Sequence, residues 1–272
     1  STDEGGKALS KTFSISIGDA NDAPSVANAI ADQTIAEDSA LSFQFASGVF
    51  SDVDVGDSLT YTATLADGSA LPSWLSFDAS TRTFSGTPTN GDVGAIDVKV
   101  TATDGTSATA TDTFTLTVTN TNDAPTITSS ETASVDEDVA YSYTFAASDV
   151  DVGDSVTLAA PTKPSWLTFN SATGVLSGAP SNDEVGDHSV VLTATDTNGA
   201  VSTQSFTVTV ANVNTAPEVT STAITNATED TAYSYTFAAS DVDSDDTPTL
   251  AAPTKPSWLS FDASTAVLSG TP

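Results

Sequence analysis

The chain has 272 residues, of which 38% are hydrophobic, and its 36 acidic residues against 6 Lys and Arg give a formal net charge of −30. Such a charge repels nucleic acids and anionic membranes, so the composition excludes a nucleic-acid-binding protein. No apolar run approaches the roughly 18 residues that a membrane-spanning helix needs. The lack of cysteine excludes disulfides and thiolate metal sites. Solubility alone, or divalent cations that each offset about two charges, would explain the acidity equally well.

An internal repeat organises the sequence. Asn21-Asp22-Ala23-Pro24 recurs as Asn122-Asp123-Ala124-Pro125, and again in altered form as Asn214-Thr215-Ala216-Pro217. Between these marks the same features follow in order: a Glu-Asp pair, an Asp-Val-Asp loop, Pro-Ser-Trp-Leu, a Ser-Gly-x-Pro turn and, in the first two repeats, Ala-Thr-Asp. Ordered repetition of this kind indicates tandem domains.

The repeat divides the chain into four segments. We expect the C-terminal hairpin of a preceding domain (1–20), two complete repeats (21–121 and 122–213) and a truncated third repeat (214–272). The first assignment depends on Phe13, Ile15 and Ile17, which alternate as the last strand of each complete repeat does. We therefore interpret the chain as a window on a longer array.

Apolar and polar residues alternate within each repeat, as expected for half-buried strands. Phe114, Leu116 and Val118 would face a core, and the threonines between them would face water. The runs are short, rich in Thr, Val, Tyr and Phe, and bounded by turn-forming residues. About seven such strands per repeat predict an all-β chain of tandem Greek-key β-sandwiches. Short linkers such as the one ending at Pro125 would join them into an extended rod.

Acidic and amide side chains recur where two sandwiches and their linker would meet. Calcium takes six to eight oxygen ligands, and no single loop here supplies that many. An isolated Asp-x-Asp is explained by the preference of Asp for turns, but recurrence of the whole set favours calcium. The candidate metal ligands are Asp19, Asn21, Asp22, Glu37, Asp52, Asp54, Asp92, Asp104, Asn120, Asn122, Asp123, Glu137, Asp149, Asp151, Asp183, Asp196, Asn212, Asn214, Asp241 and Asp243.

This ordered set resembles the cadherin family. The linker from Asn120 to Pro125 is similar to the family's Asp-x-Asn-Asp-Asn-Ala-Pro linker, shorter by one residue. Glu37 matches the early Glu motif, Asp149-Val150-Asp151 the Asp-x-Asp motif, and Ala194-Thr195-Asp196 the x-Asp-x motif. The resemblance covers nearly the whole chain. It implies Ig/cadherin-like sandwiches, with calcium ions that bind between successive domains and make the array rod-like.

Two departures from the cadherin pattern bear on the expected sites. The family's Leu-Asp-Arg-Glu motif is absent, and other sequences occupy its place at 86–94 and 178–186. These stretches, with Pro-Ser-Trp-Leu, are similar to the dystroglycan-type cadherin-like and Ig-like repeats of large bacterial surface proteins and polysaccharide-active enzymes. At the last linker, Thr215 stands where Asp123 stands in the preceding one, so we expect a weaker site there.

From the resemblance we expect a non-enzymatic, extracellular stalk of a large bacterial surface or secreted adhesin. Its partners would be calcium ions and neighbouring repeats, and polysaccharide or like repeats on other cells are further candidates. Two alternatives stay open. The repeats could be carbohydrate-binding accessories of a secreted polysaccharide-active protein, with Trp74, Trp166 and Trp258 stacking on sugars, although such a Trp is more often core. They could also associate into filaments through edge strands.

The sequence contains few residues of the kinds that enzymes use for catalysis. His188 is the only histidine, has no counterpart in the other repeats, and is expected to be solvated at a strand edge. With no cysteine and no second histidine, a nucleophile–base triad or a typical zinc site is not expected. The acids recur at the same offsets in every repeat, which is not typical of a catalytic carboxylate pair.

Overall fold

The computed structural model describes residues 2, 4–8, 10–18, 20–54, 56–243 and 246–272. Strands dominate these residues, and the predicted all-β class is confirmed. None of the helices in this part of the chain is long and apolar enough to cross a membrane. Contacts divide the chain into two units, Ser1–Asn122 and Asp123–Pro272.

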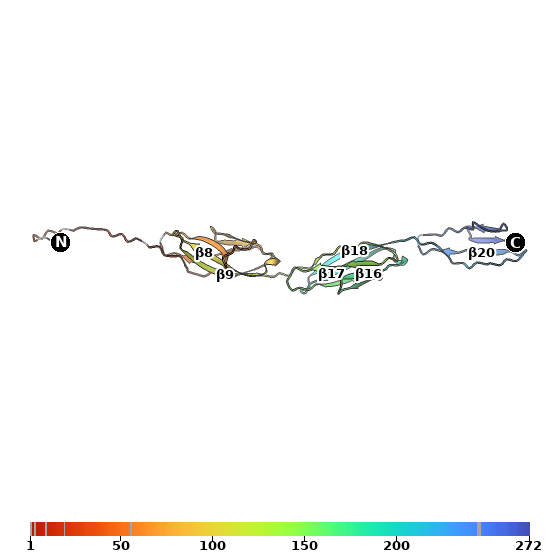
Figure 1. Ribbon diagram of the computed structural model, residues 1–272, viewed down its shortest axis with the longest axis horizontal. Coiled ribbons are helices and arrows are strands. Elements are labelled where there is room, and N and C mark those ends of the chain that lie inside the picture. Colours follow the sequence, from red (N-terminus) through yellow and green to blue (C-terminus); the bar gives the residue numbers. More distant parts are fainter. Residues whose placement is uncertain (1, 3, 9, 19, 55, 244–245) are drawn as a thin grey trace. The chain divides into compact units, whose positions relative to one another are not determined.

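The first unit contains one β-sandwich (Figure 1). Its elements are β1 (Ser25–Val26), β2 (Gln33–Ala36), β3 (Leu41–Gln44), β4 (Phe50–Ser51), β5 (Thr60–Leu65), β6 (Leu75–Asp78), β7 (Thr83–Gly86), the short 3-10 helix η1 (Asn90–Asp92), β8 (Gly94–Thr103) and β9 (Thr109–Thr119). One sheet has the order β2-β9-β8-β5, with β2 parallel to β9 and the other pairs antiparallel. The facing sheet has the order β3-β7-β6, and β1 pairs with β4.

The second unit begins with a sandwich of the same topology. Its elements are β10 (Thr126–Ile127), β11 (Ser134–Asp136), β12 (Tyr141–Thr144), β13 (Ala147–Ser148), β14 (Thr157–Thr162), β15 (Leu167–Asn170), β16 (Val175–Gly178), η2 (Asn182–Glu184), β17 (Gly186–Thr195) and β18 (Val201–Ala211). The sheets have the orders β11-β18-β17-β14, β12-β16-β15 and β10-β13. Each strand order therefore repeats that of the first unit.

The rest of the second unit forms two small sheets. Its strands are β19 (Glu218–Val219), β20 (Tyr233–Thr236), β21 (Ala239–Ser240), β22 (Leu259–Asp262) and β23 (Val267–Gly270). The orders β20-β23-β22 and β19-β21 match two of the three sheets of each preceding repeat. Tandem sandwiches, as predicted from the internal repeat, are confirmed.

The alternating apolar residues form the cores, as the sequence predicts. On β9, Phe114, Leu116 and Val118 are all buried. Phe84 on β7 in the facing sheet contacts Phe114 edge-on, with ring centroids 5.5 Å apart. Full burial of such a side chain contributes roughly 1.5–3 kcal/mol. A slip of one residue would turn threonines inward, so the core fixes the strand register.

The structure also differs from some expectations. Each complete repeat has nine strands rather than about seven, because two-residue pairs such as β1 and β4 are included. Among the described residues of 1–20, one bridge joins Thr2 to Ala8, and Phe13 and Ile17 are 75% and 92% exposed, so the assignment of this segment to a preceding domain stays a prediction. His188 lies on the central strand β17, not at an edge, and its Nε2 lies 2.6 Å from the Glu184 carbonyl oxygen.

The Ser-Gly-x-Pro turn requires glycine because the main chain of the tryptophan of the same repeat lies against it. A Cβ atom on Gly86 would overlap the carbonyl oxygen of Trp74 and press on its indole ring. The same overlap recurs at the equivalent pairs Gly178–Trp166 and Gly270–Trp258. This close approach joins the Trp segment to the following strand, and the turn leads directly to η1 or η2 in the complete repeats.

Replacement of this glycine should destabilise its repeat. We expect Gly86→Ala to lower the free energy of unfolding by about 1–3 kcal/mol, because the backbone of Trp74 must move. Urea unfolding followed by tryptophan fluorescence measures the change. Gly48→Ala in the same repeat is the control, since a Cβ there meets no atom within 4 Å. Equal stability of the two variants would contradict the prediction.

Candidate metal centres

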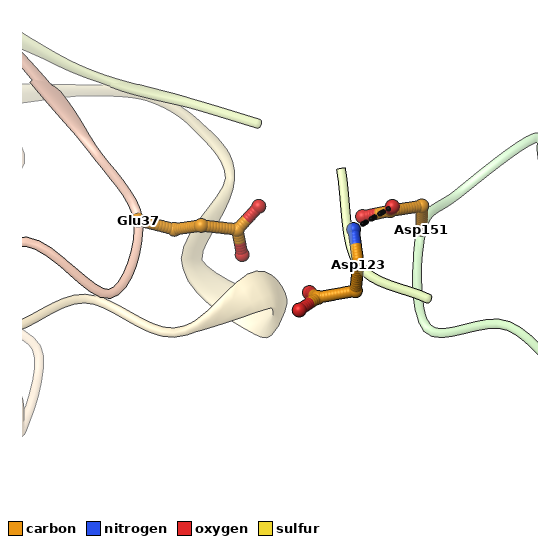
Figure 2. Close-up of side chains that lie close together, drawn as sticks. All are labelled: Glu37, Asp123 and Asp151. Atoms are coloured by element: carbon orange, nitrogen blue, oxygen red, sulfur yellow. Dashed lines mark hydrogen bonds between the residues drawn. The ribbon is translucent and has the colours of Figure 1, made fainter. Parts of the chain in front are cut away.

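A Glu-Asp turn positions one buried carboxylate in the first repeat. Asp38 has a φ of 57°, and its backbone N–H donates to the Pro88 carbonyl oxygen at 2.8 Å. Aspartate tolerates this left-handed conformation better than most residues. The turn buries Glu37, drawn in Figure 2, to 1% exposure. Its Oε1 accepts the backbone N–H of Thr121 at 2.8 Å, and its Oε2 is buried with no hydrogen-bond partner among the described residues.

The second repeat builds the same turn. Asp138 also has a φ of 57° and donates its backbone N–H to the Pro180 carbonyl oxygen at 2.7 Å. Glu137 is 5% exposed, and its Oε1 accepts the backbone N–H of Val213 at 2.7 Å. Oε2 is again buried, with no hydrogen-bond partner in the part of the chain that the structure describes. A buried, ionised carboxylate is costly unless a positive charge compensates it.

The Asp-x-Asp loops present further carboxylates to the linkers. In each loop the first Asp accepts the backbone N–H of the second, at 3.0 Å (Asp52 from Asp54), 2.9 Å (Asp149 from Asp151) and 3.1 Å (Asp241 from Asp243). The second Asp accepts a linker N–H through Oδ2, at 2.8 Å (Asp54 from Asp22), 2.8 Å (Asp151 from Asp123; Figure 2) and 2.7 Å (Asp243 from Thr215). The linker backbone therefore sets the position of these carboxylates.

An additional aspartate joins each loop, and sequence reasoning missed it. Carboxylate oxygens of three residues lie within 4.8 Å of one another in each of the clusters Asp52/Asp57/Asp104, Asp149/Asp154/Asp196 and Asp241/Asp243/Asp246. Asp57, Asp154 and Asp246 were not among the predicted ligands. Their signal was present, since each stands three residues after an Asp-x-Asp in all three repeats.

The clustered charges perturb ionisation. Desolvation, followed by the charges of Asp52 and Asp104, raises the pKa of Asp57. Desolvation and the corresponding aspartates of the second repeat raise the pKa of Asp154 in the same way. In contrast, the Asn21 side chain, which donates to Asp104 at 3.0 Å, lowers the pKa of that carboxyl. Each cluster therefore holds carboxylates that repel one another at neutral pH.

In the second unit one amide meets two of the predicted carboxylates. One end of the Asn212 side-chain amide lies 3.1 Å from Asp243 Oδ1 and 3.1 Å from Glu137 Oε1. With nitrogen at this end the amide donates to both carboxylates. With oxygen there, three oxygens converge, which is the arrangement that a hard cation requires. Asn182 Nδ2 also donates to Asp243 Oδ1, at 3.2 Å.

The acids of the two short 3-10 helices take other positions. Asp92 closes its own turn, because its Oδ2 accepts the backbone N–H of Thr89 at 2.9 Å and the Thr89 hydroxyl at 2.8 Å. In η2 the equivalent cap is made by Glu184 with Ser181. The predicted ligand Asp183 lies between them and is exposed. These two predicted ligands are thus not brought to a carboxylate cluster.

The linker asparagines differ in their contacts. Asn120 Oδ1 accepts from Asn90 Nδ2 at 3.4 Å, and Asn214 Nδ2 donates to the next residue's carbonyl oxygen at 3.3 Å. Asn122 has an interaction partner as well. The predicted ligand Asp19 lies outside the described residues. The linker asparagines therefore do not make the same contacts at each linker.

Three successive stretches of the chain match one domain family. The family model described as "Putative Ig domain" matches residues 23–119, 124–211 and 216–272. The chain belongs to this family. No curated protein matches the sequence of these Ig-like repeats.

Solved structures with a similar fold are cadherin repeats. Mouse Cadherin-23 EC22-24 is 17% identical at a TM-score of 0.50, with 93% of this chain and 89% of that chain covered. Human CDH23 EC21-23 is 17% identical at a TM-score of 0.51, with 88% of each chain covered. The Protocadherin GammaB4 extracellular domain is 20% identical at a TM-score of 0.49; the alignment covers 92% of this chain but only 45% of that one. At these identities the likeness to the two Cadherin-23 structures shows the fold, a tandem Ig/cadherin-like repeat.

The tryptophans of these Ig-like repeats take part in packing. The half-buried ring of Trp166 makes edge contacts with Tyr141 and His188, with centroids 6.0 and 5.8 Å away. Its Nε1 is buried and has no hydrogen-bond partner among the residues that the structure describes. These ring contacts support the core interpretation of this residue.

Removal of a clustered carboxylate should stabilise the metal-free protein at neutral pH. Asp154→Asn should raise the melting temperature in chelator at pH 7. The folded-state pKa of Asp154 is raised above its ordinary value of 3.8, so its penalty is present at neutral pH and disappears as the pH falls below that value. The gain should therefore vanish near pH 3.5.

The control for this comparison is Asp136→Asn, a change at an exposed position of β11. Thermal melts of both variants and the parent protein at the two pH values suffice. A gain for Asp154→Asn that is the same at both pH values, or absent at pH 7, would show that repulsion in the cluster does not limit stability.

Proposed function

We propose that the chain is an extracellular structural or adhesive array in which calcium ions bind at the junctions between Ig-like repeats. In this proposal the repeats occupy residues 21–121, 122–213 and 214–272, residues 1–20 end a preceding domain, and the array is the stalk of a large bacterial surface or secreted adhesin. The family match in three successive stretches and the recurring carboxylate clusters support it.

The observation that carries the proposal is the environment of Glu137. This side chain is 5% exposed, and its Oε2 has no hydrogen-bond partner among the described residues. Its Oε1 shares the amide of Asn212 with Asp243, which is 2% exposed. Two buried carboxylates that meet at one neutral amide repel each other. A divalent cation would neutralise both charges and give Oε2 a partner.

Calcium suits this donor set better than other metals do. The groups offered are carboxylate and amide oxygens, whereas zinc and copper prefer sulfur and nitrogen ligands. Magnesium demands a near-ideal octahedron, while calcium accepts six to eight oxygens in flexible geometry. At this junction Glu137, Asn212 and Asp243 would hold the ion. The calcium ion would supply a fixed positive charge there and would link the two repeats and the linker between them.

The connectivity of the chain supports a similar site at the preceding linker. Glu37 binds the backbone nitrogen of Thr121, and Asp151 binds that of Asp123. These nitrogens are two residues apart, and two residues of extended chain span at most about 7 Å. Each carboxylate is thus held by the linker backbone on its own side. In this proposal Glu37, Asp123 and Asp151 are the candidate calcium ligands of this linker.

The two linkers should differ in affinity. Thr215 donates its backbone N–H to Asp243 at 2.7 Å, as Asp123 does to Asp151 at 2.8 Å, so the local backbone arrangement is kept. Thr215 contributes no carboxylate, however, and calcium affinity rises with the charge count of the ligands. Extracellular calcium modules operate at dissociation constants of about 10⁻⁴–10⁻³ M, a range in which such unequal sites can both be filled.

Calorimetric titration should show several calcium ions bound per molecule, in at least two affinity classes, with a rise in melting temperature. One ion that binds only the folded state adds about 2.7 kcal/mol when free calcium is 100 times its dissociation constant. Glu137→Gln should have opposite effects with and without the ion. In chelator it removes a buried charge and does not destabilise, whereas in calcium it removes the gain from the second junction.

Glu218→Gln, on the exposed strand β19, is the matched control for charge removal. Absence of binding, with equal melting temperatures in calcium and chelator, would mean that the acidic residues only keep the protein soluble. Equal destabilisation by Glu137→Gln in both conditions would mean that Glu137 acts only as the acceptor for Val213.

Calcium at the junctions should also restrict the movement of one repeat against the next. In chelator the clustered carboxylates repel one another. X-ray scattering should then give a smaller maximum dimension than in calcium, with a profile typical of a more flexible particle. A variant with both Glu37→Gln and Glu137→Gln should behave in calcium as the parent protein does in chelator. An unchanged maximum dimension would contradict the stiffening role.

A further inference from the structure

A turn asparagine reaches the proposed second junction, although it belongs neither to the linker nor to an Asp-x-Asp loop. Asn182 is the first residue of η2, and its Nδ2 donates to Asp243 Oδ1 at 3.2 Å. When the oxygen of the Asn212 amide faces Glu137 and Asp243, this Oδ1 also lies 3.5 Å from Asn182 Nδ2. Both neighbours are groups that we propose to hold calcium, so Asn182 lies at the edge of the ion's position.

The backbone beneath Asn182 is firmly held. Glu184 accepts from the backbone N–H of Ser181 at 2.8 Å and from its hydroxyl at 2.5 Å. The backbone N–H of Glu184 in turn donates to the Ser181 carbonyl oxygen at 2.9 Å, and that of Val185 to the Asn182 carbonyl oxygen at 3.2 Å. This capping box leaves the Asn182 side chain as the part of the turn that can rotate.

The same pair of asparagines meets in the first repeat. Asn90 is the first residue of η1, and its Nδ2 donates to Asn120 Oδ1 at 3.4 Å. The sequences of η1 and η2 are Asn-Gly-Asp and Asn-Asp-Glu, so asparagine is the one position at which the two turns agree. A contact between a turn asparagine and a linker asparagine in both complete repeats indicates a role beyond turn formation.

We propose that Asn182, and by equivalence Asn90, is a neutral calcium ligand that serves both states of its junction; this inference rests on the proposed calcium site. In the metal-free state its amide nitrogen donates to Asp243. A half-turn of the amide exchanges nitrogen for oxygen in nearly the same space. The side chain then offers its carbonyl oxygen to the ion, as calcium sites commonly require.

The charge count explains why an amide stands there. Glu137 and Asp243 already supply the two negative charges that one calcium ion balances, and Asp241 and Asp246 place two more carboxylates near Asp243. The buried and unpartnered Oε2 of Glu137 shows that negative charge already exceeds the donors available among the described residues. A further carboxylate at position 182 would bind calcium more tightly but would add repulsion to the metal-free state. Asn182 therefore lowers the affinity and protects the empty junction.

Backbone amides of the linker offer a site-resolved test by NMR in the full chain. Val213 and Thr215 donate to the two junction carboxylates, so their amide resonances report calcium at this junction. We expect Asn182→Asp to lower the calcium midpoint of these resonances about tenfold and Asn182→Ala to raise it about tenfold. In chelator Asn182→Asp should also lower the melting temperature.

Two internal controls accompany this test. Thr121 and Asp123 report the preceding linker and should keep their midpoints in every variant. Asn170→Asp adds the same charge to the same repeat at a turn where the other repeats carry Asp78 and Asp262, and it should change no midpoint. Unchanged Val213 and Thr215 midpoints in both Asn182 variants, with calcium still bound, would overturn this inference alone. No response of the parent protein's linker amides to calcium would overturn the proposed function together with it.

Discussion

The rest of this molecule depends on one constraint, which is that carboxylates meet at a backbone linker. The chain has 36 acids and only 6 Lys and Arg. Linker N–H groups provide the first compensation, since Thr121 and Val213 each donate to a buried Glu. A neutral donor satisfies one oxygen but leaves the charge in place. The second oxygen of each Glu stays without a hydrogen-bond partner among the described residues, so the repeats carry charge that their own side chains do not neutralise.

The residues that stabilise the fold are separate from the carboxylates near the linkers. The cores are apolar and depend on strand alternation, as with Phe84 against Phe114. The carboxylates come instead from turns and loops whose shapes are set locally, by the left-handed Asp38 and Asp138 and by the hydrogen bond within each Asp-x-Asp loop. Because the core does not need the loops to be neutral, the complete repeats can tolerate Oε2 of Glu37 and of Glu137, which are buried with no hydrogen-bond partner among the described residues.

The local sequence pattern predicted those features of the structure that depend on residues near one another in the sequence. The core positions on β9 followed from period two, and Glu37 and Glu137 followed from recurrence at one offset. The Asp-x-Asp motif ends at Asp151 and therefore does not predict Asp154, which stands three residues later. His188 was misplaced because the strand order that makes β17 central depends on long-range pairing, which no local pattern encodes.

Under the proposed function, the unequal linkers have a consequence for the array. Asp123 adds a carboxylate where Thr215 adds none, while both make the same backbone hydrogen bond to the following Asp-x-Asp loop. A difference in ligand charge changes affinity without changing the path of the chain. As calcium falls, the junction with fewer carboxylates would release its ion first and become a hinge between repeats that are still ordered. Graded substitution at one linker position would thus place flexibility at chosen points of a stalk without any change to the sandwiches.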